Sequence, residues 1–206
     1  MSNPRILILF YSMYGHIYEL TKSIVEGIEE AQGEPIIKKV AELVPDQYLD
    51  DYAKKFKESI KDIKEGNPRE DFEGIDGIII GTPTRFGNMC AQMKNYLDQT
   101  SSFWLKGTLV GKPASVFTSS ATQHGGQEST ILSTMIPLLH QGCVLVGLPY
   151  SFQEQMRIDE ITGSSPYGVS TITGGKGERF PSENEKKLAK DLGKYLTNIA
   201  RKLKDN

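Results

Sequence analysis

Three short loops rich in hydroxyl, glycine and aromatic residues could together hold a phosphate group and a flat ring. The first loop, residues 12–17, supplies the Ser12 hydroxyl and, in Gly15, a residue that allows close approach to the backbone, but it holds no lysine or arginine. Because the loop is predicted to open a helix, its free N–H groups and the helix dipole favour an anion held by neutral donors. It matches neither G-x-G-x-x-G nor the Walker P-loop, which disfavours a classical dinucleotide fold and an NTPase. Taken alone, the loop is equally compatible with a tight turn.

The second and third loops carry groups that suit a ring. Residues 81–88 combine a stiffening Pro83 with Arg85 and Phe86, which offer a charge and an aromatic face. Residues 118–126 are small and hydroxyl-bearing, so a flat ring could lie against them and bond their backbone amides. Without a ligand, the second loop could instead be an ordinary turn with one surface arginine, and the third loop a flexible connection.

Each loop follows an apolar run of strand length and precedes a helical pattern. Continuous apolar runs are typical of strands buried on both faces of a parallel sheet. Strands are predicted at residues 6–11, 35–40 near an edge, 75–81, 114–117 and, as the last central strand, 143–147. Five strands alternating with helices predict an α/β fold: a doubly wound five-stranded parallel sheet with helices on both faces.

Apolar residues spaced by three and four predict the helices. They fall at residues 17–28, in part of the connection 45–70, at 89–97, at 127–140 despite Pro137, and after a Ser182–Glu185 capping box. Residues 149–181 hold many glycines and prolines without sustained periodicity, so they are predicted to be one long functional loop. The length of 206 residues suits a single domain, 1–206, that carries this insertion.

The three loops all follow strands, and in doubly wound sheets ligands bind beyond the carboxyl ends of the strands. Together they can hold one phosphate tail and one polar ring edge, which describes FMN.

Four sequence blocks carry a resemblance to a known family. The blocks are Tyr11-Ser12-Met13-Tyr14-Gly15-His16-Ile17, the run from Gly81 to Met89 with Leu97-Asp98-Gln99-Thr100, His124-Gly125-Gly126-Gln127-Glu128, and Ser165-Pro166-Tyr167-Gly168. In this order, and over essentially its whole length, the chain resembles the WrbA-type NAD(P)H:quinone oxidoreductases. The resemblance implies a flavodoxin-like fold, a homotetramer, FMN as cofactor and NADH or NADPH as electron donor.

The resemblance also implies a site. Tyr14 matches a position linked to the nicotinamide cofactor and Trp104 one linked to the substrate. The third loop is longer and poorer in glycine than in some members, so it is carried over as a group. The implied FMN contacts are Ser12, Met13, Tyr14, Gly15, His16, Ile17, Thr84, Arg85, Phe86, Ser119, Ser120, Ala121, Thr122, Gln123, His124 and His140.

The expected chemistry belongs to the flavin. Hydride transfer at flavin N5, followed by departure of the donor and entry of a quinone at the same place, gives ping-pong kinetics and two-electron reduction. No side chain is assigned as a certain catalyst; Arg85 is a candidate for stabilising the charge of the reduced flavin. Phe86, Trp104 and Tyr14 could form an apolar slot for a flat ring.

Composition narrows the function. The 24 basic and 26 acidic residues leave a net charge of −2, and the lysine-rich stretches alternate with acids, which disfavours nucleic acid as a partner. No apolar run reaches the roughly 20 residues of a membrane span. The three histidines lack metal-ligand spacing, and two distant cysteines suggest neither a disulfide framework nor a metal site. The cytoplasm is the expected location.

Other functions stay open from the residues alone. A flavodoxin-like one-electron carrier is the nearest alternative, although its protein docking would favour a stronger acidic face. A regulatory binding protein and an FMN reductase or azoreductase are further alternatives. His140 could be an ordinary helix-end residue and Trp104 an ordinary core residue. The quinone and the choice between NADH and NADPH are not specified, because no residue is placed to read a ribose 2′ group.

Overall fold

The computed structural model describes residues 3–204, and its centre is a parallel β-sheet. The strand order is β2-β1-β3-β4-β5, with β6 also paired to β4. The order reverses between β1 and β3, which is the switch point of a doubly wound sheet. The strands are β1 (Arg5–Phe10), β2 (Glu34–Lys39), β3 (Gly77–Pro83), β4 (Pro113–Ser120), β5 (Val144–Leu145) and β6 (Val169–Ile172).

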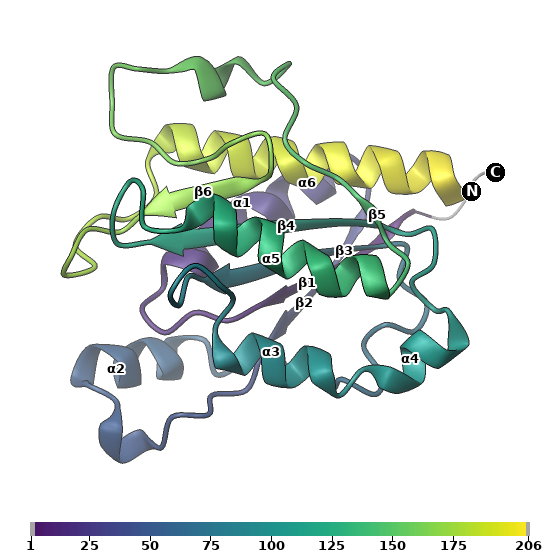
Figure 1. The fold of residues 1–206 in the computed structure, drawn as a ribbon, viewed down its shortest axis with the longest axis horizontal. Coiled ribbons are helices and arrows are strands. Elements are labelled where there is room, and N and C mark those ends of the chain that lie inside the picture. The colour runs from purple at the N-terminus through teal and green to yellow at the C-terminus, as the bar shows by residue number, and fades with distance from the viewer. Residues whose placement is uncertain (1–2, 205–206) are drawn as a thin grey trace.

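Helices cover both faces of the sheet, as predicted (Figure 1). Apolar side chains of α1 and α6 form the core on one face, and those of α3, α4 and α5 form the core on the other. The helices are α1 (His16–Glu30), η1 (Asp46–Tyr48), α2 (Asp51–Ser59), α3 (Ala91–Asp98), α4 (Ser101–Lys106), α5 (Gln127–His140), η2 (Gln153–Met156) and α6 (Glu183–Lys204).

Helices α1 and α6 approach so closely that two glycines are required. A Cβ on Gly27 would lie 1.9 Å from the Lys190 carbonyl oxygen, and one on Gly193 would lie 2.3 Å from that of Ile24. A side chain at either position would push the helices apart, so the sequence secures this contact with the one residue that lacks a Cβ.

The fifth position in the sheet differs from the prediction. The segment expected as the last central strand is the two-residue β5, which lies at the edge and pairs with the start of β4. Strand β6 continues the same edge and pairs with residues 117–120 of β4. The prediction of residues 149–181 as an unbroken loop is therefore wrong at residues 169–172. Two of these four residues, Ser170 and Thr171, are polar yet buried, which concealed the strand in the sequence.

The excursion between β5 and β6 starts and ends at neighbouring points. The Leu148 N–H donates to the Pro166 carbonyl oxygen at 2.9 Å. Only Gly147 fits there, because a Cβ on it would lie 2.3 Å from the same oxygen. The intervening residues run over α6 at the top of the view (Figure 1). Because the two ends of the excursion meet, the chain returns to the edge of the sheet where β5 ended, and β6 can pair with the next part of β4.

Candidate functional site

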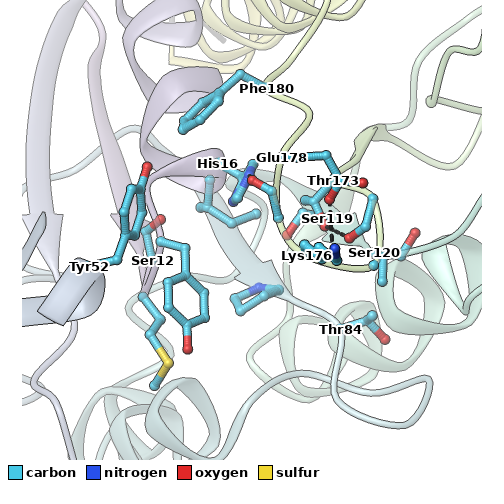
Figure 2. Close-up of a pocket in the computed structure, with 18 of the residues that line it drawn as sticks. Ser12, His16, Tyr52, Thr84, Ser119, Ser120, Thr173, Lys176, Glu178 and Phe180 are labelled. Atoms are coloured by element: carbon cyan, nitrogen blue, oxygen red, sulfur yellow. Dashed lines mark hydrogen bonds between the residues drawn. The ribbon is translucent and has the colours of Figure 1, made fainter. Parts of the chain in front are cut away.

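A cleft of about 750 Å³ lies at the carboxyl ends of the strands. These ends point to the left in Figure 1, where α2 and the loop after β6 also lie. Figure 2 shows Ser12 and Tyr52 on one side and Ser119, Ser120 and Thr173 on the other. The lining residues are Ser12, Met13, Tyr14, His16, Ile17, Asp50, Tyr52, Pro83, Thr84, Arg85, Ser119, Ser120, Ala121, Thr173, Gly174, Gly175, Lys176, Gly177, Glu178 and Phe180.

The first loop ends in an open helix start. The Gly15 N–H donates to the Ser12 hydroxyl at 3.1 Å, and Gly15 takes a left-handed conformation (φ +96°) immediately before α1. Among the described residues, no side chain caps this helix. The first N–H groups of α1 therefore face the cleft with the positive end of the helix dipole, an arrangement that suits a phosphate.

His16 connects the first loop to the loop after β6. Its Nε2–H donates to the Gly177 carbonyl at 3.0 Å, and its ring stacks on Phe180 with centroids 4.7 Å apart. Burial lowers the pKa of His16, and the hydrogen bond to Gly177 offsets this in part. The imidazole is therefore neutral at pH 7 and adds no charge to the cleft.

Tyr14 is held over the cleft by α2. Its hydroxyl donates to Asp50 Oδ2 at 3.1 Å, while Asp50 Oδ1 accepts the Ala53 N–H and caps α2. Burial, and then the hydrogen bond to Asp50, raise the pKa of Tyr14. The Tyr52 ring lies 6.1 Å away and joins Tyr14 as an aromatic wall. Tyr14 faces the cleft as expected, with its ring available to a flat ligand.

The second loop is a tight turn that separates Phe86 from the other two candidate residues, Thr84 and Arg85, which both line the cleft. Arg85 and Asn88 exchange backbone hydrogen bonds at 2.8 and 3.1 Å, and Phe86 and Gly87 between them both have positive φ, as in a type I′ turn. Arg85 lines the cleft, whereas the Phe86 side chain is fully exposed outside it. A bulky residue in this backbone region is strained, and such strain clusters at functional positions.

The third loop is also split. Ser119, Ser120 and Ala121 line the cleft, and the Thr84 N–H donates to the Ser119 carbonyl at 2.9 Å, which fixes the second loop to the third. The other candidates, Thr122, Gln123 and His124, do not line the cleft. Instead, carbonyls of this part accept from side chains nearby: that of Thr122 from Ser120 Oγ at 2.7 Å and that of Gln123 from Gln127 at 3.1 Å.

A fourth wall, residues 173–178, was not among the predicted contacts. The Thr173 and Gly174 N–H groups donate to the carbonyls of Ser120 and Ala121 at 2.8 and 3.1 Å. Together with the His16 hydrogen bond, this places the segment between the first and third loops. The sequence carried only part of the signal: three glycines within four residues, 174–177, resemble the other cleft loops, while the polar Ser170 and Thr171 concealed the strand before them.

Trp104 and His140 lie away from the cleft. Helix α5 begins beside the third loop, and its 14 residues carry His140 to the opposite end of the sheet, about 20 Å away at 1.5 Å per residue. Trp104 is in α4, which lies near that same end (Figure 1). Both side chains are exposed. Neither can touch a ligand in the cleft of its own chain.

The residues present fit FMN. The uncapped start of α1 supplies neutral donors for a phosphate. Gly15, directly before it, has a left-handed backbone (φ +96°) in which a side chain would be strained and would crowd Phe56. The cleft volume lies within the range of small-molecule sites. Within residues 3–204, no group of three or more His, Cys, Asp or Glu side chains could hold a metal ion. The helices described there also lack the length and apolar character needed to cross a membrane.

Comparison with known proteins identifies relatives along the whole chain. The family model described as NADPH-dependent FMN reductase matches residues 4–153. An NAD(P)H dehydrogenase (quinone) of Geobacter metallireducens is 56% identical over 202 residues, which cover 97% of this chain and 99% of the relative. Another of that name, from Aromatoleum aromaticum, is 53% identical over 95% of each chain.

Solved structures show the same fold. A WrbA-like flavodoxin from Agrobacterium tumefaciens superposes with a TM-score of 0.66 at 19% identity and covers 97% of this chain and 99% of its own. Flavodoxin 1 from Bacillus cereus superposes with a TM-score of 0.60 at 17% identity, covering 94% and 97%. The flavodoxin-like fold and the family resemblance indicated by the four sequence blocks are confirmed.

Proposed function

This chain belongs to the family of NADPH-dependent FMN reductases and NAD(P)H dehydrogenases (quinone), and from that premise we propose that it reduces quinones with electrons from NADH or NADPH, in pairs and by a ping-pong sequence. The observation that carries the proposal is that an open helix start and two loops suited to a flat ring converge on one cleft. Bound FMN would accept electrons from the nicotinamide and return them to the quinone. Because one cleft serves donor and acceptor, the first must leave before the second enters.

The side chains of the cleft position the reactants and balance charge. The backbone N–H groups of residues 13–17 hold the phosphate, while Thr84, Ser119 and Ser120 meet the polar edge of the ring. Arg85 offers its guanidinium to the negative charge that accompanies reduction. Tyr14, fixed by Asp50, borders the space for the nicotinamide or quinone.

We also propose a homotetramer, in which Trp104, His140 and Phe86 meet the cleft of a neighbouring copy. A row of exposed apolar residues, Leu132, Ile136 and Leu139, runs along the outer face of α5. The row continues to the exposed Val110. Its side chain lies against Gly142, just beyond the end of α5, because a Cβ on Gly142 would touch it. Exposed apolar patches of this kind mark protein interfaces. An interface there would bring Trp104 and His140, which lie far from the cleft of their own chain, and the exposed Phe86 to the cleft of a neighbour.

Sedimentation tests the assembly. The expected species has four times the chain mass of 22.9 kDa, and Ile136→Glu, which puts a charge into the apolar row, yields smaller species. A monomer at micromolar concentration would contradict the proposal.

We further propose that the protein is cytoplasmic. Its two cysteines are free and buried, which agrees with a reducing compartment, and fractionation of the source cells tests the location.

An anaerobic titration tests the activity. FMN-loaded protein is mixed with NADH, and in parallel with NADPH, while the flavin absorbance is followed; benzoquinone is then added. The expected result is rapid bleaching without the band of half-reduced flavin, followed by full recovery with quinone. Reduction by neither donor, with a stable half-reduced form on chemical titration, would instead indicate a one-electron carrier. Failure to bind FMN would remove both functions.

A further inference from the structure

Lys176 lies on the fourth wall of the cleft, and its ammonium is one of the two basic charges there. The other is Arg85, on the second loop. Among the contacts of residues 3–204, Arg85 bonds to the adjacent Thr84 carbonyl and Lys176 bonds through its backbone N–H, and neither cation has a carboxylate partner in an ion pair. FMN carries two centres of negative charge, the phosphate and the ring when reduced. The cleft therefore offers one cation for each.

The two cations are carried by loops with different attachments. Arg85 follows β3, and its loop is bonded to the third loop, where the ring edge would lie. Lys176 immediately precedes Gly177, whose carbonyl accepts from His16 in the first turn of α1. This turn is the one that presents free N–H groups to a phosphate. The loop that carries Lys176 is thus bonded at residues 173 and 174 to the third loop and at Gly177 to the phosphate end, and Lys176 lies between these two attachments.

The helix start supplies only neutral donors, so a cation beside it would add the charge that a phosphate lacks there. Residues 12–17 contain no lysine or arginine, and buried His16 is neutral at pH 7. Glu178 also lines the cleft, and its carboxylate is fixed by the Lys176 N–H at 2.8 Å. A phosphate dianion would meet this negative charge with only the neutral N–H donors of α1 to offset it, unless the Lys176 side chain turned toward it.

We propose that Lys176 pairs with the phosphate of FMN, so that a loop outside the three family-type binding segments sets the affinity for the phosphorylated flavin. The inference rests on the proposed function. Residues 173–178 are hydrogen-bonded to Ser120, Ala121 and His16. In this proposal the segment covers the bound cofactor, and Lys176 makes its charged contact with the phosphate. A charge-assisted hydrogen bond to phosphate is stronger than a neutral one, so its loss weakens FMN binding about tenfold at low salt.

The test compares FMN with riboflavin, which lacks the phosphate. Dissociation constants are measured by quenching of flavin fluorescence on the apoprotein of the wild type, Lys176→Met and Lys176→Arg. Lys61→Met is the matched control, since it removes an exposed lysine charge outside the cleft. The expected result is FMN bound about tenfold more weakly by Lys176→Met alone, equal riboflavin binding throughout, and a steeper salt dependence in the wild type than in Lys176→Met.

Three results would overturn the inference. FMN and riboflavin weakened to the same extent would place Lys176 at the ring or in a structural role. Unchanged FMN affinity with a raised KM for NADPH would place it at the phosphate of the electron donor. Unchanged dissociation constants for both flavins, together with an unchanged KM for NADPH, would exclude any contact between Lys176 and either ligand. Wild-type protein that binds neither flavin would end the proposed function itself, which is a different outcome from all three.

Discussion

Replacing Arg85 with alanine slows the reduction of bound FMN by NADH roughly 10- to 100-fold when FMN is saturating, since preorganised charge at a reacting centre contributes on this scale or above it. The expected loss of rate is smaller than the largest losses known for removal of such a charge, because Arg85 is exposed and its charge is partly screened by solvent. Its guanidinium is oriented by the second-loop turn and by its bond to the Thr84 carbonyl at 2.9 Å. Without this cation, negative charge on the reduced ring loses a favourable partner, so the midpoint potential of the flavin also falls.

Stopped-flow absorbance under anaerobic conditions measures the rate, and a dye equilibrium measures the potential. Arg85→Lys retains the charge and recovers part of the rate, though not the planar geometry of the guanidinium. Arg69→Ala, an exposed arginine outside the cleft, serves as the control. If Arg85→Ala matches the wild type in rate, potential and FMN affinity, Arg85 has no role in the site.

Replacing Glu185 with alanine lowers the free energy of unfolding by about 3 kcal/mol or more, the usual cost of breaking a buried ion pair. The Glu185 side chain is fully buried. It accepts the Gly163 N–H, the Thr171 hydroxyl and the Ser182 N–H, each at 2.8 Å, and Arg179 at 2.9 Å. Alanine leaves all four donors without this acceptor.

The loss appears as a lower melting temperature, by roughly 6 to 12 °C for a chain of this size. Glu183→Ala is the matched control, because its side chain is 90% exposed and its carboxylate forms a surface ion pair with Lys186. This variant changes stability by less than about 0.5 kcal/mol. Glu185→Ala also weakens FMN binding, since Thr171 and Arg179 flank the fourth wall. Equal melting temperatures for the two variants would refute the role given to Glu185.

Glu185 also illustrates what the sequence could and could not predict. The spacing from Ser182 to Glu185 predicts a capping box, and the structure confirms it: the Ser182 N–H bonds to the carboxylate, and the Glu185 N–H bonds to Ser182 Oγ at 3.3 Å. That prediction was possible because both partners lie within one helical turn. The bonds to Gly163 and Thr171 join distant segments, and no local pattern records them.

The sequence by itself determined the α/β class, the first four strands with the helices α1, α2, α3 and α5, the C-terminal helix α6, and the three loops at the carboxyl edge of the sheet. Each of these depends on local periodicity or on the residue types of one turn, which reflect burial and backbone preference directly. Tertiary structure alone decided that β5 and β6 share one edge, that residues 173–178 close the cleft, and that Trp104 and His140 lie at the far end of the molecule. These outcomes depend on which distant segments pack together, and the packing of each segment is set by the rest of the fold rather than by its own residues.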